Sequence, residues 1–307
     1  MNTSLTPLSP QILDWIRAIS GSASQVSAVK KLSGSTSTTL YRLDISRGAQ
    51  TLPLVLRLFD NPEWLAEEPE LARHEASNLQ MVSKAEIAAP ELVGFDETGE
   101  FCGVPAILMT RVPGEVNLLP KDTDAWLYEI AAAIQPLHHI EIDSYLWEYF
   151  PYNDVSQLQV PPWTDIPEAW ARAIEIVQGP WPDFRPCFIH RDYHPMNVLW
   201  QGEHLSGIVD WPNACRGPAG IDLIWCRNNL SAMYGIEIAD RFLDAFIDVA
   251  GSSFTYDPFW DLLGIIETLP GPPDVYEPWL EFGLDHLTPE LDRIHLEQYL
   301  QSVLACI

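Results

Sequence analysis

The chain has 307 residues, 47% of them hydrophobic, which is enough to bury the core of one large domain or of two lobes. Its 43 acidic residues against 17 basic ones give a net charge of −26, which argues against nucleic-acid or membrane partners and favours a cationic one, although solubility alone would also explain it. The five cysteines are scattered, so we expect neither disulfides nor a zinc site. The N-terminal segment is polar and lacks a secretory pattern, and the apolar runs are too short to cross a bilayer. We therefore expect a cytoplasmic protein.

The first 113 residues are predicted to be rich in strands. Ser9 and Pro10 are a typical cap and first residue of a helix, and apolar residues then recur at helical spacing from Ile12 to Ile19. The expected elements, in chain order, are a helix from residue 10, strands over 40–43 and 52–59, a helix over about 69–83 and a strand over 104–109. The last strand leads to a Pro-Gly break at residues 113 and 114.

Beyond Gly114 the pattern is mostly helical, for example over 126–137. His138 and His139 follow that helix, where an imidazole complements the helix dipole. A strand-rich island from Cys187 to Asp210 interrupts the helices. We therefore expect an α+β fold of two lobes, with a small β-rich lobe over 1–113 and a larger, mainly helical lobe over 114–307.

The island carries a cluster of polar residues beside its strands. Segments 198–200 and 205–209 predict a hairpin around Gly202. Phosphoryl transfer needs a carboxylate that accepts the proton of the attacking hydroxyl, and oxygen ligands that hold Mg²⁺ against the phosphates. Asp192 suits the first role, and Asn197 and Asp210 suit the second. The order His190-Arg191-Asp192, four residues, then Asn197 matches the kinase catalytic loop.

This stretch resembles the aminoglycoside phosphotransferase and choline kinase group. The resemblance implies a protein-kinase-like fold and an ATP- and Mg²⁺-dependent transfer to the hydroxyl of a small molecule. It also implies Asp192 as the catalytic base, Asn197 and Asp210 as metal ligands, and His190 and Asp222 as supports of the loop. The alternative reading of these residues is that they are ordinary turn and strand-end residues.

Two departures from kinases bear on the substrate. Met196 stands where many relatives have glycine, and Pro212 stands where a protein kinase has the glycine of its Asp-Phe-Gly. Only 12 positions separate Asp210 from Asp222, which leaves no room for an activation loop. Protein substrates are therefore not expected.

The N-terminal lobe should supply the nucleotide site. A serine-rich segment between two strands offers Ser35, Thr36 and Ser37 to phosphate oxygens. Arg57 occupies the strand position of the kinase lysine, and Glu75 interrupts an apolar helix face, where the strand arginine would be its partner. The alternatives are a solvent-facing Arg57 and a solvated Glu75.

The segment that joins the lobes, around Thr110 and Val112, is expected to contact adenine through its backbone, as the resemblance implies. Two functions remain open: an active kinase for a small, amine-bearing hydroxyl compound, or a nucleotide-binding module without catalytic activity. Acidic residues of the C-terminal lobe are candidates for receiving an amine or are solvated, and they are Asp257, Asp261, Glu267, Glu281 and Asp285. One or two of the twelve tryptophans are candidates for a cation–π contact.

Overall fold

The computed structural model describes residues 8–21, 24–32, 37–142, 144–269 and 271–307. The chain divides into two compact units. Unit 1 comprises Met1–Pro113 and Ile208–Asn213, and unit 2 comprises Gly114–Gly207 and Ala214–Ile307. The break after residue 113 lies where the sequence predicts the lobe boundary, but the short return of 208–213 to unit 1 is not evident from the sequence.

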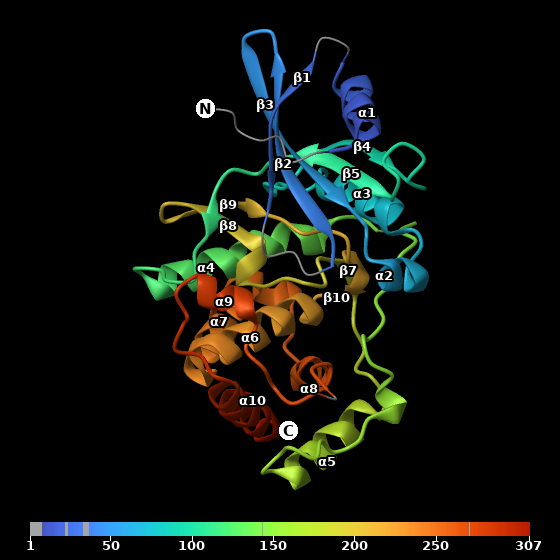
Figure 1. Cartoon of the computed structure of the whole chain (residues 1–307). Helices are drawn as coiled ribbons and strands as arrows, with labels where there is room; N and C mark the ends of the chain where they lie inside the picture. Colours follow the sequence, from blue (N-terminus) through green and yellow to red (C-terminus); the bar gives the residue numbers. More distant parts are fainter. Residues whose placement is uncertain (1–7, 22–23, 33–36, 143, 270) are drawn as a thin grey trace. The chain divides into compact units, whose positions relative to one another are not determined.

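Unit 1 is built on a five-stranded sheet in the order β1-β2-β3-β5-β4, and every neighbouring pair is antiparallel. Figure 1 shows these strands with α1 beside them. Its elements are α1 (Pro10–Ser20), β1 (Gln25–Lys31), β2 (Thr39–Arg47), β3 (Gln50–Leu58), α2 (Pro62–Glu67), α3 (Leu71–Val82), β4 (Leu92–Asp96) and β5 (Ala106–Thr110).

Alternation along β3 separates two chemical environments. Leu54, Leu56 and Leu58 face the apolar core that α1 covers with Ile12, Trp15 and Ile16. Side chains of a strand alternate between faces, so Arg57 points to the other side of the sheet. The N-cap of α1 is the predicted one, because the Ser9 hydroxyl accepts a hydrogen bond from the Ile12 N–H at 3.2 Å. The α1 helix therefore covers the leucine face of β3, and Arg57 lies on the opposite face of the sheet.

The helix predicted over 69–83 is α3, which is shorter by two residues at its start and one at its end. It contacts β4 and β5. The preceding α2, capped by Asn61, was not predicted, because its six residues are too few to show an apolar period.

Unit 2 is mainly helical and contains two small sheets, β10-β7 and β6-β8-β9. The predicted hairpin is β8 and β9, with Gly202 at a φ of 65° in its two-residue turn. Its helices and strands are β6 (Glu115–Val116), α4 (Thr123–Ile134), α5 (Pro167–Val177), β7 (Pro186–Ile189), β8 (Val198–Gln201), β9 (His204–Ile208), β10 (Cys215–Pro218), α6 (Gly220–Tyr234), α7 (Ile236–Ala250), α8 (Pro258–Ile266), α9 (Glu277–Glu281) and α10 (Pro289–Leu304).

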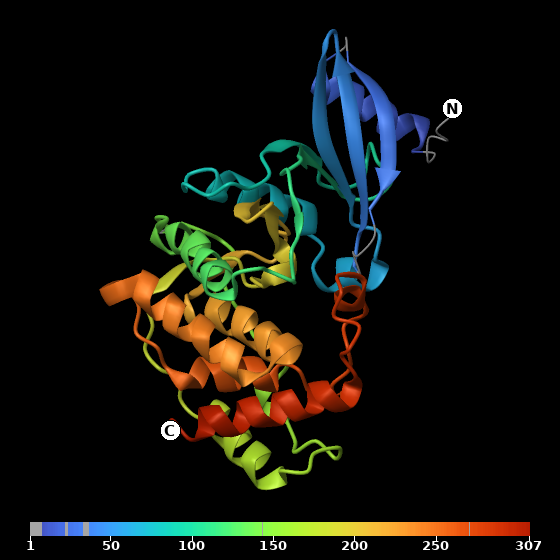
Figure 2. The same cartoon turned by 90° about the vertical axis from the view of Figure 1, so that its left-hand side faces the viewer.

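The core of unit 2 is formed where α5, α6, α8 and α10 meet. In Figure 2 the red α10 passes over the yellow-green α5, and the buried Trp170 and Tyr299 come from these two helices. This core holds the first turn of α6, the strand β7 that precedes the predicted catalytic loop, and β10, which pairs with β7. Within the described ranges, each helix is too short or too polar to cross a bilayer.

Candidate functional site

The predicted catalytic loop begins where β7 ends, and Asp222 in the first turn of α6 fixes its backbone. The Asp222 carboxylate is fully buried. It accepts hydrogen bonds from the backbone N–H groups of His190 at 3.1 Å and Arg191 at 2.8 Å. The Nε2 of His138 lies 2.8 Å from the same carboxylate. His138 lies in the last turn of a 3-10 helix (Gln135–His139), as the sequence predicted a helix end here, and its ring also contacts Asp222, which the sequence did not predict.

Arg191 has a backbone conformation that few side chains adopt, with a φ of 69°. Its buried guanidinium donates to the Phe150 carbonyl oxygen at 2.9 Å. It also lies 4.2 Å from the centre of the Phe150 ring and 4.3 Å from that of Tyr152. Strained conformations of this kind cluster at functional sites, where the surrounding packing holds them in place. The aromatic contacts of Arg191 therefore fix the position of the next residue, Asp192.

Asp192 is held from its C-terminal side by Asn197. The Asn197 amide nitrogen donates to the Asp192 carbonyl oxygen at 2.9 Å and lies 3.5 Å from its carboxylate. His194 Nε2 is 3.6 Å from the other carboxylate oxygen. The Asp192 side chain is still 31% exposed, so its carboxylate is fixed in position and accessible. A carboxylate in this state can accept a proton from a bound hydroxyl.

Unit 1 brings three predicted residues into direct contact. Arg57 Nε lies 3.1 Å from a Glu75 carboxylate oxygen, and another guanidinium nitrogen lies 2.7 Å from Asp210. Arg57 and Glu75 are buried, while the Asp210 side chain is 38% exposed. Arg57 also donates to the Thr38 hydroxyl at 3.3 Å. The alternatives of a solvent-facing Arg57 and a solvated Glu75 are therefore wrong.

The charges of this group are strongly coupled. Burial lowers the pKa of Arg57, but the charges of Glu75 and Asp210 outweigh it and raise that pKa. Burial raises the pKa of Glu75, against the pull of Arg57 and with a further rise from Asp210. Arg57 therefore stays cationic, which suits a contact with phosphate oxygens.

The segment after Asp210 is hydrogen-bonded to α3. The Asn78 amide donates to the carbonyl oxygens of Trp211 at 2.6 Å and Pro212 at 3.3 Å. Asn78 lies three residues after Glu75, so both project from the same face of the helix. Asp210 itself has a φ of 71°, an uncommon conformation for a residue other than glycine. Sequence reasoning missed Asn78, although its i+3 spacing from Glu75 is a usable signal.

The remaining nucleotide-site predictions have mixed outcomes. Ser35 and Thr36 lie outside the described residues, and Ser37 is a half-buried residue just before β2. The Thr110 N–H donates to the Glu91 carbonyl oxygen at 2.9 Å, and the Thr110 hydroxyl accepts from the Glu91 N–H at 2.8 Å. These bonds engage the Thr110 N–H and hydroxyl, so an adenine contact at Thr110 would have to use its carbonyl oxygen; the backbone contact at Thr110 and Val112 stays a prediction.

Oxygen donors suitable for Mg²⁺ are present in both units. In unit 2, the side-chain hydrogen bonds of Asn197 use its amide nitrogen, and its amide oxygen takes part in none of them. In unit 1, Asp210 presents a partly exposed carboxylate. The described residues contain no group of three or more His, Cys, Asp or Glu side chains placed to hold a metal. Mg²⁺ typically takes only one or two carboxylates together with waters and substrate phosphates, so the Asp210 carboxylate is a donor of the kind that it uses.

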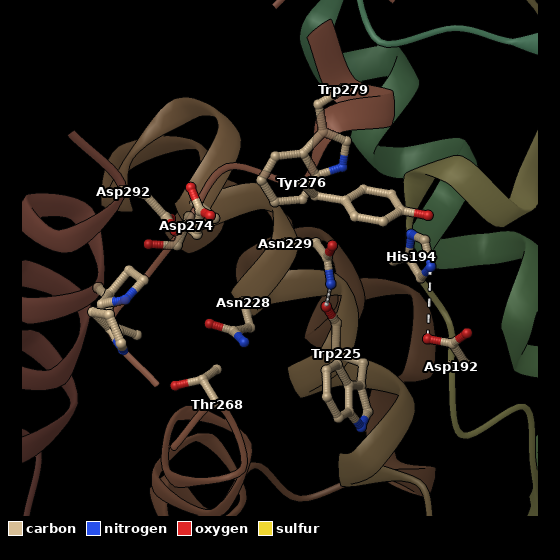
Figure 3. Close-up of a pocket in the computed structure, with 15 residues that line it drawn as sticks. Asp192, His194, Trp225, Asn228, Asn229, Thr268, Asp274, Tyr276, Trp279 and Asp292 are labelled. Atoms are coloured by element: carbon tan, nitrogen blue, oxygen red, sulfur yellow. Dashed lines mark hydrogen bonds and ion pairs between the residues drawn. The ribbon is translucent and has the colours of Figure 1, made fainter. Parts of the chain in front are cut away.

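A cavity of about 430 Å³ in unit 2 has Asp192 and His194 in its wall (Figure 3). Its volume is in the range that takes small organic ligands. The rest of the wall comes from α6, α9, α10, Thr268 and residues 272–276. It consists of Trp225, Asn228, Asn229, Ser231, Ala232, Thr268, Pro272, Pro273, Asp274, Tyr276, Trp279, Asp292 and Leu296.

The acidic residues suggested by the sequence as amine contacts are not in this wall. Asp261 is paired with Arg227 at 2.9 Å, and Glu267 accepts from the Tyr149 hydroxyl at 3.0 Å. Asp257 caps α8 instead. The wall contains Asp274 and Asp292, which the sequence prediction missed. Of the tryptophans, the wall contains Trp225 and Trp279.

Comparisons with known proteins bear on the family and the fold. A family model described as "Phosphotransferase enzyme family" matches residues 28–259. A homoserine kinase of Chelativorans sp. (strain BNC1) is 28% identical over 218 residues, which cover 65% of this chain and 63% of that protein. The chain spans only 44% to 63% of the length of the first curated relatives it matches.

Two solved structures share the fold. Aminoglycoside phosphotransferase APH(4)-Ia in complex with ADP and hygromycin B has a TM-score of 0.60 at 13% identity, with 95% of this chain and 98% of that one covered. The streptomycin–ATP–APH(2")-IIa complex has a TM-score of 0.55 at 16% identity, with 80% and 84% covered. These likenesses confirm the predicted protein-kinase-like fold.

Proposed function

The chain belongs to the phosphotransferase enzyme family, and we propose that it transfers the γ-phosphate of ATP to a hydroxyl group of a small, cationic molecule. The observation that carries this proposal is the position of Asp192. Its carboxylate is fixed by the catalytic loop, remains 31% exposed and borders a cavity of about 430 Å³. A small alcohol bound there has a proton acceptor within its own site.

In the proposed reaction, the acceptor hydroxyl oxygen forms a bond to the γ-phosphorus while the bond from that phosphorus to the β,γ-bridging oxygen breaks. The hydroxyl proton passes to the Asp192 carboxylate, and ADP leaves with the electron pair of the broken bond. Asn197 and Asp222 orient Asp192 through the loop backbone. His190 belongs to the same loop, and its buried side chain serves as a support for it.

For the nucleotide, we assign unit 1. Arg57 is the phosphate contact, Glu75 is the residue that orients Arg57, and Val112 is the backbone contact for adenine. Ser37 belongs to the phosphate-covering segment. Mg²⁺ would be held by Asn197 and Asp210 and, when bound, would neutralise charge on the phosphates.

The proposal is tested with Asp192→Asn. The amide keeps the shape of the side chain but is not a base, so turnover should fall by roughly 10²- to 10⁴-fold, the usual contribution of a general base. ATP affinity should stay near that of the wild type, because the nucleotide contacts are assigned to other residues. Phosphate transfer from Mg²⁺-ATP to a pooled panel of amino alcohols, amino sugars and aminoglycosides is followed by mass spectrometry, and ATP binding by calorimetry.

Two outcomes would contradict the proposal. Equal turnover in Asp192→Asn and the wild type would remove Asp192 from the role of base. ATP binding by the wild type with no product from any acceptor, and no ATP hydrolysis, would favour the nucleotide-binding module without catalytic activity. As a matched control, Asp248→Asn changes an exposed carboxylate on α7 that does not line the cavity, and it should behave as the wild type.

A further inference from the structure

The charged side chains of the cavity beside Asp192 are mostly acidic. Its fifteen lining residues include three carboxylates, from Asp192, Asp274 and Asp292, and no lysine or arginine. The buried arginine of α6, Arg227, does not line the cavity and is paired with Asp240 and Asp261. A cation entering this cavity meets three opposite charges, whereas an anion meets three like charges and no lysine or arginine.

The carboxylates are placed at two separate positions. In Figure 3 Asp274 and Asp292 lie together on one side of the cavity, and Asp192 lies on the other. Asp274 belongs to the segment before α9, and Asp292 belongs to the first turn of α10. A ligand that presents a hydroxyl to Asp192 can therefore extend a cationic group toward Asp274 and Asp292.

The wall of the cavity also contains buried polar groups without a hydrogen-bond partner among the described residues. The Trp279 side chain is 6% exposed, and its indole N–H has no hydrogen-bond partner among the described residues. Ser231 is 1% exposed, and its hydroxyl also has no hydrogen-bond partner among the described residues. Asn229 donates its amide nitrogen to the Trp225 carbonyl oxygen at 2.8 Å, which leaves its amide oxygen toward the cavity (Figure 3). An indole N–H only donates, so a ligand that reaches the Trp279 N–H has to offer it an acceptor.

We propose that Asp274 and Asp292 select the acceptor by charge, so that the cavity admits a hydroxyl compound with a cationic nitrogen and rejects one that also carries a carboxylate. This inference rests on the proposed function, because it takes the cavity beside Asp192 as the acceptor site. The selection is partly repulsive: a carboxylate on the ligand meets no lysine or arginine among the lining residues and faces three like charges.

Two pairs of compounds isolate the two halves of this rule. Homoserine and 3-aminopropan-1-ol differ only by the carboxylate, and glucosamine and glucose differ by a cationic nitrogen in place of a hydroxyl. We expect 3-aminopropan-1-ol to bind at least about tenfold more tightly than homoserine, and glucosamine more tightly than glucose by a similar factor. Binding is measured by calorimetry with the whole chain, first without nucleotide and then with a non-hydrolysable ATP analogue.

The residue assignment is tested with Asp274→Asn and Asp292→Asn. Each should weaken glucosamine binding roughly tenfold and leave glucose binding unchanged, because only a charged contact is lost. Asp248→Asn, which removes an exposed carboxylate outside the cavity, should alter neither. Circular dichroism of each variant establishes that it is folded, so that lost binding is not lost structure.

Failure of this inference is distinguishable from failure of the proposed function. Homoserine bound or phosphorylated as well as 3-aminopropan-1-ol would overturn the charge selection and leave the kinase intact. Unchanged glucosamine binding in both variants would remove Asp274 and Asp292 from the role. Charge-selective binding without any phosphate transfer would support the selection while overturning the proposed function.

Discussion

The carboxyl group of Asp292 is half-buried in the first turn of α10, at the wall of the cavity. Burial raises its pKa to about 6, with an opposing pull from His295 and a further rise from the charge of Asp274. Near neutral pH this side chain is ionised in the folded protein at a cost in stability. A site that is held ready for a cation is expected to carry such a cost, because the ligand is the missing partner.

This cost predicts the pH dependence of an Asp292→Asn variant. The folded-state pKa is raised, so the wild type loses stability relative to the variant as pH rises from the unfolded value, near 3.8, through about 6. We therefore expect the variant to have the higher Tm at pH 7.5 and a nearly equal Tm at pH 4. Calorimetric melts at the two pH values provide the measurement. A variant that is less stable than the wild type at pH 7.5 would show that the ionised carboxylate stabilises the fold.

At the scale of elements, the catalytic loop depends on the start of α6. One buried carboxylate, Asp222, accepts from two consecutive loop N–H groups and contacts His138. The loop lies between β7 and β8, and its Arg191 is held in the left-handed region. A loop in this conformation needs its backbone donors satisfied, because buried unpaired N–H groups are costly.

Asp222→Asn should therefore damage both stability and catalysis. An asparagine places an N–H₂ group against N–H donors, so we expect a loss of about 1–3 kcal/mol in the free energy of unfolding and a lower kcat at unchanged ATP affinity. The matched control is Asp261→Asn, which changes an equally buried carboxylate paired with Arg227. The control should lose stability but keep its kcat per folded molecule. A kcat for Asp222→Asn equal to that of the control would make Asp222 a purely structural residue.

The same elements explain how far the sequence could predict the site. Asp192 and Asn197 follow from a fixed local spacing, and Glu75 follows from a charge inside an apolar stripe, which requires a partner. His138 and Asp274 gave no such signal. The contact of His138 joins positions 84 residues apart, and Asp274 lies in a proline-rich segment without periodicity. The acceptor side of the site is thus specified by tertiary packing, which a single sequence reveals poorly.

At the scale of the whole molecule, the charge of −26 and the acidic cavity have the same sign. Several of the 17 basic residues are already paired with local carboxylates, among them Arg57, Arg227 and Arg293. The unpaired charge is therefore mostly negative. Such a field raises the local concentration of cations and is screened by salt, with a Debye length of about 8 Å at 0.15 M.

The salt dependence of ligand binding distinguishes the field of the whole chain from the local contacts of the cavity. We expect the dissociation constant of glucosamine to rise between about 50 and 500 mM NaCl and that of glucose to stay constant, because only the cation is attracted by the field. A double Asp274→Asn, Asp292→Asn variant should lose most of this salt dependence if the two carboxylates dominate. If the double variant retains the full slope, the attraction comes from the distributed charge of the chain instead. A salt-independent affinity for glucosamine in the wild type would contradict both sources, because neither a surface field nor a solvent-accessible ion pair escapes screening.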